Sequence, residues 1–250
     1  EEKIQNTVSS YFTDDKTSLS QIIFKAPFKP GVQQTGFIPN NIVTKRIILK
    51  FNICNSADSA ISVFFCPGFY FDKITLYRLK QEGLIEIPAV LPPIAEGTGY
   101  RLISLPAQDS ATIIAELRAV KTYNNGIRPR LIGKDNLQLF LAKLHSNYIQ
   151  TNLITYVFCG LLLMMILFSI TNFLQGRNRE FLYYSGYAFF LGGLLFFQTI
   201  YHLHSSQIGF FLEGYLDFIL QGVGIIFYML FMKKFLDTKN KHPFLSTLYN

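Results

Sequence analysis

The acidic side chains with the clearest potential for chemistry lie in an apolar stretch near the C-terminus. Glu213, Asp217 and Gln221 are four residues apart, so they share one face of a helix. If this stretch crosses a membrane, a carboxylate within it is costly and marks a functional site, which predicts a signal-linked or proton-linked role. The alternative is a polar face that packs against neighbouring helices. His202 and His204 would have to join Glu213 to hold a metal ion, and because a lone HxH pair is weak evidence we expect no metal site.

Motifs for catalysis or cofactor binding are absent from the sequence. It contains no G-x-x-x-x-G-K-[ST], no H-E-x-x-H, no G-x-S-x-G and no Rossmann glycine pattern. No pair of acids has a spacing that predicts a glycosidase. We therefore expect no enzyme, no catalytic residue and no cofactor.

The three cysteines do not have the spacing of a zinc site, because no CxxC is present. Cys54 and Cys66 would form a disulfide if two strands brought them together. The simpler interpretation is that both are small buried apolar side chains. Cys159 lies in an apolar run of the second half.

Charge and apolar residues divide the chain into two parts. The formal net charge is +7, but Lys and Arg form no stripe with interleaved aromatics, so we expect no nucleic-acid partner. From Asn152 onward the chain is mostly Leu, Phe, Ile, Tyr and Gly, with charge confined to short clusters. This division predicts an N-terminal domain in water and a C-terminal part whose partner is a lipid bilayer.

Three successive apolar stretches, at about residues 153–174, 181–203 and 208–235, are long enough to cross a bilayer as helices. None has the charged face of a surface helix, and Tyr and Phe cluster near several ends, as in an interfacial aromatic belt. The alternative, a large all-helical core, fits poorly with runs that are apolar on every side.

The loops between these stretches predict an orientation. Arg177 and Arg179 lie between the first two, Lys233 and Lys234 end the third, and the remaining loop has no Lys or Arg. Because basic residues favour the cytoplasmic side, the N-terminal part should lie outside. The first residues lack the apolar segment of a signal peptide, so we expect a leader or a longer parent protein.

Residues 1–134 are predicted to form a β-sandwich of jelly-roll type. Short apolar or alternating runs recur between turn-forming segments, at the spacing of a sandwich domain. The expected strands are at residues 22–25, 46–53, 60–65, 73–79, 84–87, 100–105, 111–120 and from 128. Apolar residues at helical spacing after Asp135 predict a connecting helix over residues 135–151 that leads into the first membrane stretch.

The order of these parts resembles a bacterial receptor family. The segments that carry the resemblance are "SQIIFKAPFKPGVQQTGF", "RIILKFNICNSADSAISVFFCPGFYFDKITLYRL", "GRNREFLYYSGYAFF" and "FMKKFLDTKNKHPFL". They resemble the seven-transmembrane receptors with diverse intracellular signalling modules (7TMR-DISM). The resemblance implies an outer β-sandwich, seven membrane helices of which residues 152–250 would supply three, and a cytoplasmic output module. It also implies a multi-pass protein of the bacterial inner membrane.

The resemblance further implies a ligand domain similar to carbohydrate-binding jelly rolls. Phe69, Tyr70 and Phe71 are the candidates for exposed rings that stack on a sugar; the alternative is that they belong to the strand and the core. We therefore expect the sensor part of a membrane receptor, with an unidentified outer ligand for which carbohydrate is the candidate class. A homodimer is left open, as is a different function, a subunit of a membrane transporter or envelope assembly.

Overall fold

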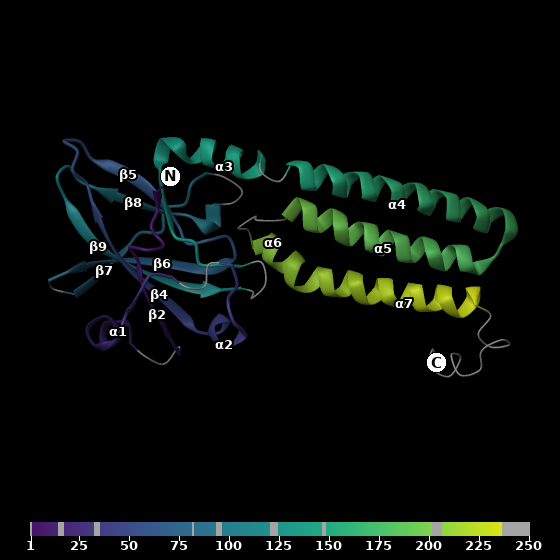
Figure 1. Ribbon diagram of the computed structural model, residues 1–250, viewed down its shortest axis with the longest axis horizontal. Helices are drawn as coiled ribbons and strands as arrows, with labels where there is room; N and C mark the ends of the chain where they lie inside the picture. Colours follow the sequence, from purple (N-terminus) through teal and green to yellow (C-terminus); the bar gives the residue numbers. More distant parts are fainter. Residues whose placement is uncertain are drawn as a thin grey trace. The chain divides into compact units, whose positions relative to one another are not determined.

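The computed structural model describes residues 2–14, 18–32, 36–81, 83–93, 97–120, 125–146, 149–201 and 207–236. The chain forms two compact units (Figure 1). Unit 1 is Glu1–Leu144 with Leu203–Phe210, and unit 2 is His145–His202 with Phe211–Asn250. Each unit is described by itself below.

Unit 1 contains two antiparallel sheets, which confirms the predicted β-sandwich class. Sheet A has the order β1 (Glu2–Lys3), β10 (Arg130–Gly133), β5 (Ile61–Cys66), β8 (Arg101–Leu105). Sheet B has the order β3 (Lys29–Pro30), β2 (Ser9–Thr13), β4 (Arg46–Cys54), β9 (Ser110–Ala119), β6 (Phe71–Lys80), β7 (Gly83–Ile87). The jelly-roll connection stays a prediction.

The core lies between the two sheets and is built from alternate strand positions. On β4, Ile47, Leu49 and Phe51 are buried in this core, because successive side chains of a strand point to opposite faces. Phe51 of sheet B stacks on Phe65 of sheet A, with ring centroids 5.2 Å apart. We call the core side of sheet B its inner face and the other side its outer face.

The expected strand at residues 22–25 is wrong, because this segment belongs to helix α1 (Leu19–Lys25). Ile22 and Ile23 are both buried, which a half-buried strand would not allow for adjacent residues. With Leu19 they recur at helical spacing and pack on Ile48 and Ile114 of the outer face of sheet B. The sequence analysis also missed β1, β2, β3 and the short helix α2 (Asn40–Val43).

A second helix covers sheet A. After the 3₁₀ turn Lys134–Asn136, helix α3 runs over Leu137–Ser146. Leu137, Phe140 and Leu141 are buried against residues of β5 and β10 and against Tyr100. The guanidinium of Arg130 lies 5.7 Å from the centre of the Phe140 ring. Helix α4 begins at Ile149.

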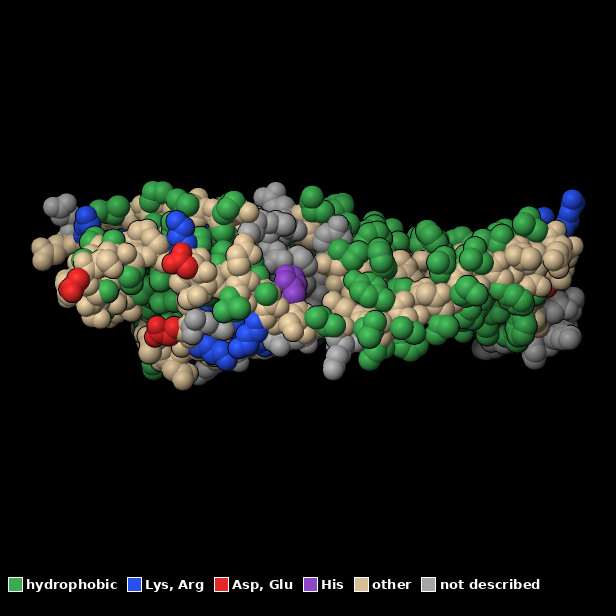
Figure 2. Space-filling model, turned by 90° about the horizontal axis from the view of Figure 1, so that it is seen from above, with side chains coloured by type: hydrophobic (Ala, Val, Ile, Leu, Met, Phe, Trp, Pro, Cys, Tyr) green, Lys and Arg blue, Asp and Glu red, His purple; other side chains and the backbone are tan. Residues whose placement is uncertain are grey.

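Unit 2 consists of helices, three of which are long and apolar enough to cross a membrane: Asn152–Gly176, Arg179–Ile200 and Ile208–Phe235. Its elements are α4 (Ile149–Gly176), α5 (Arg179–Tyr201), a π-helical turn (Leu212–Leu216) and α7 (Asp217–Phe235). The short helix α6 (Gln207–Phe211) belongs to unit 1 except for its last residue. Helix α5 lies between α4 and α7 (Figure 1). Most of the large apolar side chains of these helices are exposed, as expected of lipid-facing surfaces (Figure 2).

Helices α5 and α7 are joined by aromatic pairs and by a close approach at glycine. The ring centroids of Tyr187 and Tyr228 are 5.3 Å apart, and those of Phe190 and Phe227 are 5.5 Å apart. A Cβ on Gly186 would overlap the Phe227 ring, so only glycine fits at this crossing.

Candidate functional site

The three aromatic residues singled out in the sequence do not form an exposed ring platform. Tyr70 and Phe71 are 1% and 0% exposed, and Phe69 is half-buried. Phe71 belongs to the core between the sheets. The expectation that all three rings are exposed is therefore wrong for Tyr70 and Phe71, since a ring stacks on a sugar only through a free face. Ligand binding at these residues stays a prediction.

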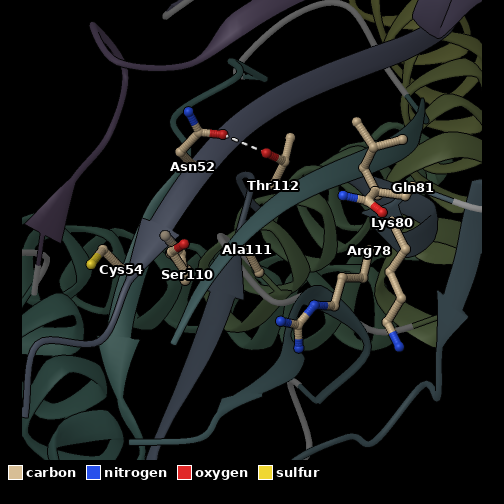
Figure 3. Close-up of a pocket in the computed structure, with 10 residues that line it drawn as sticks. Asn52, Cys54, Arg78, Lys80, Gln81, Ser110, Ala111 and Thr112 are labelled. Carbon is tan, nitrogen blue, oxygen red and sulfur yellow. Dashed lines mark hydrogen bonds between the residues drawn. The ribbon is translucent and has the colours of Figure 1, made fainter. Parts of the chain in front are cut away.

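A hollow of about 730 Å³ lies instead at one end of sheet B (Figure 3). Its lining comes from three adjacent strands and the turn after β6: Asn52, Ile53, Cys54, Arg78, Leu79, Lys80, Gln81, Ser110, Ala111 and Thr112. This volume is in the range of small-molecule sites.

The strand register divides this lining between the two faces of the sheet. Thr112 pairs with Asn52 on one side and with Leu79 on the other, and all three belong to the outer face. Arg78 pairs with Ile113, a core residue, so its side chain belongs to the inner face. Figure 3 shows the same division, with Asn52 and Thr112 facing each other and Arg78 and Lys80 extending the other way.

The outer-face half of the hollow offers uncharged hydrogen-bonding groups. The Thr112 hydroxyl donates to the Asn52 carbonyl oxygen at 2.8 Å, which fixes the amide. The Asn52 amide nitrogen then points away from Thr112 as a donor (Figure 3). Ser110 and Gln81 add further polar groups, and Leu79 supplies an apolar surface. Such a surface can bind hydroxyl groups from a ligand.

The inner-face half carries an ion pair. A guanidinium nitrogen of Arg78 donates to the Asp109 carboxylate at 2.8 Å, and both side chains are 28% exposed. This hydrogen bond, with smaller contributions from the charges of Arg78 and Lys80, holds the pKa of Asp109 below its ordinary value. The pair therefore anchors the end of β6 to the start of β9.

In unit 2 the structure places one acidic residue in an interhelical hydrogen bond. The Gln198 amide of α5 donates to the Asp217 carboxylate of α7 at 2.9 Å. Asp217 directly follows the π-helical turn, a feature often found at functional sites. The sequence analysis missed Gln198, although a polar residue within an apolar span was the signal that could have found it.

Comparison with known proteins identifies the helical part. The family described as 7TM diverse intracellular signalling matches residues 151–250, and no curated protein matches the chain. The membrane segment belongs to this family. The resemblance to 7TMR-DISM receptors stated from the sequence is thereby confirmed for this segment.

The other polar residues predicted in the 7TMR-DISM segment lie as follows. Gln221 is exposed on α7, one turn after Asp217. Glu213 lies in the π-helical turn, and its side chain is outside the described part of the structure. His202 and His204 also lie outside the described residues. Among the residues searched, no group of three metal-ligating side chains is found.

The basic residues expected to set the topology lie at the same ends of the 7TMR-DISM helices as in the sequence analysis. Arg177 and Arg179 lie at the junction of α4 and α5, and Lys233 and Lys234 lie in the last turn of α7. Arg177 adopts a left-handed conformation (φ 51°), and its N–H donates to the Phe173 carbonyl at 2.7 Å. This arrangement ends α4.

The three cysteines are free thiols in three different environments. Cys54 is exposed in the hollow, Cys66 is buried beneath α3, and Cys159 lies on α4 with its sulfur 3.7 Å from the Gly192 carbonyl oxygen of α5. The sequence analysis placed both Cys54 and Cys66 in the core as one alternative, which holds for Cys66 alone.

Proposed function

We propose that this chain is the sensing part of a bacterial inner-membrane receptor. In this proposal the sandwich lies outside the cytoplasm and binds a hydroxylated ligand, with carbohydrate as the candidate class, in the hollow lined by Asn52 and Thr112. Ligand binding shifts the position of α3 on sheet A, and α3 transmits this shift to α4. The output module would belong to a longer parent protein.

The packing of α3 on sheet A is the observation that supports this proposal. Three buried apolar residues, Leu137, Phe140 and Leu141, fix this helix to sheet A, and residues 147 and 148 alone separate it from the first membrane helix. A displacement of sheet A is therefore transmitted through a short link. A loosely tethered domain on a long linker would have no such path.

The basic residues support the proposed orientation. Arg177, Arg179, Lys233 and Lys234 all lie at helix ends on one side of the predicted membrane spans. Because Lys and Arg are retained in the cytoplasm, that side is inside and residues 1–134 are outside.

The uncharged outer-face half of the hollow supports a hydroxylated ligand. Asn52 and Thr112 already hold each other, so their remaining donors and acceptors are preorganised for hydroxyl groups. Because the rings of Tyr70 and Phe71 are buried, the neutral polar groups are the better candidates for contact with a sugar.

The native cysteines allow a direct test. The full chain in lipid nanodiscs is labelled with N-ethylmaleimide, with and without a panel of soluble oligosaccharides, and labelling is followed for each cysteine by mass spectrometry. We expect a bound sugar to slow labelling of Cys54, which reports occupancy of the hollow, and to change labelling of Cys159, which reports the helices. Asn52→Ala should abolish the protection of Cys54.

A matched pair of α3 variants separates binding from relay. Phe140 is 7% exposed and Leu139 is 71% exposed. Phe140→Ala should keep the protection of Cys54 and lose the response of Cys159, whereas Leu139→Ala should keep both. Protection of Cys54 with no response of Cys159 in the unmodified chain would contradict the relay, and a panel that protects nothing would contradict the ligand class.

A further inference from the structure

Strand β6 contains an irregularity that changes which residue faces Arg118. Phe71 pairs with Ala119, but the next pair of this ladder is Lys73 with Arg118, so Asp72 is passed over as a bulge. In a regular antiparallel ladder Asp72 would lie opposite Arg118 and form an opposite-charge pair. The structure therefore replaces an available ion pair with two like charges.

A third cation continues the row on the other side. Arg118 of β9 also pairs with Arg46 of β4, so Arg46, Arg118 and Lys73 lie side by side across three adjacent strands of sheet B. All three belong to the outer face, which they share with Glu116 and Ile114. We call these three residues the cation row. It lies at the opposite end of β4 and β9 from the hollow.

Among the residues that the structure describes, a tight carboxylate partner is found for one member of the cation row. Both guanidinium contacts of Arg46, Nε to Oε1 and Nη2 to Oε2 of Glu116, are 3.1 Å long, and these side chains are 17% and 13% exposed. Arg118 and Lys73 are exposed, and neither forms an ion pair with any residue that the structure describes. Asp72 is also exposed without such a pair.

The packing of the core explains the bulge, but it does not explain why residue 73 is a lysine. The bulge allows Phe71 and Ile74 to be buried in the same core, although three positions separate them. That purpose is served by any residue at position 73, and Thr or another uncharged strand former would avoid the repulsion. Like charges directly opposite on neighbouring strands destabilise a sheet. A local feature that opposes stability is expected where a ligand uses it.

We propose that the cation row binds a phosphate group. The Arg118 guanidinium supplies a planar pair of N–H donors for two phosphate oxygens, and the Lys73 ammonium supplies a point charge beside it. Neighbouring positions on adjacent strands are about 5 Å apart, a separation that one phosphate group bridges. Glu116 is held on Arg46 and leaves the two exposed cations for the ligand.

The phosphate has two possible sources, the headgroup of an anionic phospholipid or a soluble phosphate compound. Both present the same oxyanion to the cation row. The proposal is independent of the receptor proposal, because it needs neither the hollow nor the relay through α3.

Acetylation of Lys73 in the full chain tests the proposal. The protein is placed in phosphatidylcholine nanodiscs and treated with a small acetylating ester, and each lysine is followed by mass spectrometry. One arm adds inorganic phosphate against sodium chloride of equal ionic strength, and the other adds phosphatidylglycerol to the discs. We expect acetylation of Lys73 to slow about fivefold in one arm, as one bound cation would give, with the exposed Lys3 of β1 unchanged.

The arm that responds identifies the source. Slowing with phosphatidylglycerol alone means a lipid headgroup, and slowing with inorganic phosphate means a soluble ligand. If Lys73 slows in neither arm, or slows only as much as Lys3, the proposal is overturned.

Variants test the role of each group. Arg118→Gln should remove the slowing of Lys73, and Arg118→Lys should leave part of it because the charge remains without the planar fork. Lys80→Gln removes the same charge at the other end of the sheet and should leave the slowing intact, as should Asp72→Asn. Persistence of the full effect in Arg118→Gln would overturn the proposal.

A stability measurement keeps the test decisive if Arg118→Gln does not fold. Lys73→Thr should raise the thermal midpoint of the chain in the absence of phosphate, because the repulsion with Arg118 is removed. It should also abolish any rise in midpoint that the effective arm gives to the unmodified protein. A midpoint that responds equally in both proteins would place the phosphate elsewhere.

Discussion

At the scale of single residues, Gly68 is a position where the surrounding atoms leave no room for a side chain. Its φ is +146°, and a Cβ there would lie 2.6 Å from the Gly126 carbonyl oxygen and 2.9 Å from the Phe71 ring. We expect Gly68→Ala to lower the free energy of unfolding by about 2 kcal/mol or more. Chemical denaturation of the full chain in detergent measures this. Gly36→Ala is the control, because no atom lies within 4 Å of its added Cβ; equal effects at both positions would contradict the explanation.

Asp109 should make stability depend on pH. Its pKa in the folded protein is lowered by the hydrogen bond from Arg78, so the carboxylate form is favoured by folding. The stabilisation is therefore present above the ordinary aspartate pKa of about 3.9 and is lost as the pH falls through the lower folded value. Asp109→Asn should lower the thermal midpoint at neutral pH, and the difference from the unmodified chain should shrink at about pH 3.

The pH test has its own control in the partner residue. Arg78→Gln should give the same loss at neutral pH and the same convergence in acid, because either change removes one ion pair. A difference that stays constant with pH would mean that Asp109 contributes packing and not charge.

Single residues also mark where sequence reasoning fails. "GFYF" predicts exposed aromatics if the segment is a loop, but the bulge at the start of β6 directs Phe71 into the core. Whether an aromatic residue faces water or the core depends on the register of its strand, and one position of register exchanges the two faces. The local sequence pattern does not reveal this strand register.

At the scale of elements, most strands of sheets A and B follow from the sequence. β4, β5, β6, β7, β8 and β9 lie within two residues of their expected bounds, because turn residues separate runs of β-branched and aromatic side chains. The short strands β1 and β3, with two residues each, have no pattern to detect. Helix α1 was mistaken for a strand because "IIFK" is too short to distinguish the two periods.

The pairing of α5 and α7 gives a prediction at the same scale. Gln198→Leu removes the amide that donates to Asp217, so the carboxylate loses its described hydrogen-bond donor within an apolar layer. Interhelical hydrogen bonds in membranes contribute about 0.6 kcal/mol on average, and about 1.7 at most. We therefore expect a small fall in the thermal midpoint in detergent. Asp217→Asn should have less effect, because an amide oxygen still accepts the bond.

Gln221 supplies the comparison for this pair. It lies on the same helix, it is exposed, and it forms no hydrogen bond with the residues that the structure describes. Gln221→Leu should leave the midpoint unchanged or raise it slightly. If Gln221→Leu lowers the midpoint as much as Gln198→Leu does, the hydrogen bond between Gln198 and Asp217 does not contribute specifically to stability.

At the scale of the whole molecule, the division into a sheet unit and a membrane unit is visible in the sequence, whereas the hollow is not. Long apolar runs identify spans because a bilayer demands about 20 apolar residues in succession. The outer-face half of the hollow includes Asn52, Thr112 and Leu79, residues that are far apart in sequence and adjacent only through the pairing of β4, β9 and β6. Uncharged polar residues at strand ends are common, so none of these residues identifies a binding site from the sequence alone.

Topology is the property of the whole molecule on which the receptor proposal depends. The chain, expressed in a bacterium behind a secretory leader, carries the exposed Cys54 on the sandwich. A second thiol is introduced by Asn178→Cys, at an exposed position between Arg177 and Arg179 that leaves every basic residue in place. A membrane-impermeant maleimide should label Cys54 in spheroplasts and should label position 178 only after lysis, because the basic loop is retained inside.

The opposite labelling order would reverse the orientation, and the sandwich would then be a cytoplasmic domain. Labelling of both thiols before lysis would mean that α4 does not cross the membrane, although it contains the most apolar of the three candidate spans. The first result would remove the hollow from contact with outer ligands, and the second would place the basic junction of α4 and α5 outside the cytoplasm. The predicted order alone leaves Cys54 facing the environment and the basic helix ends facing the compartment where an output module would act.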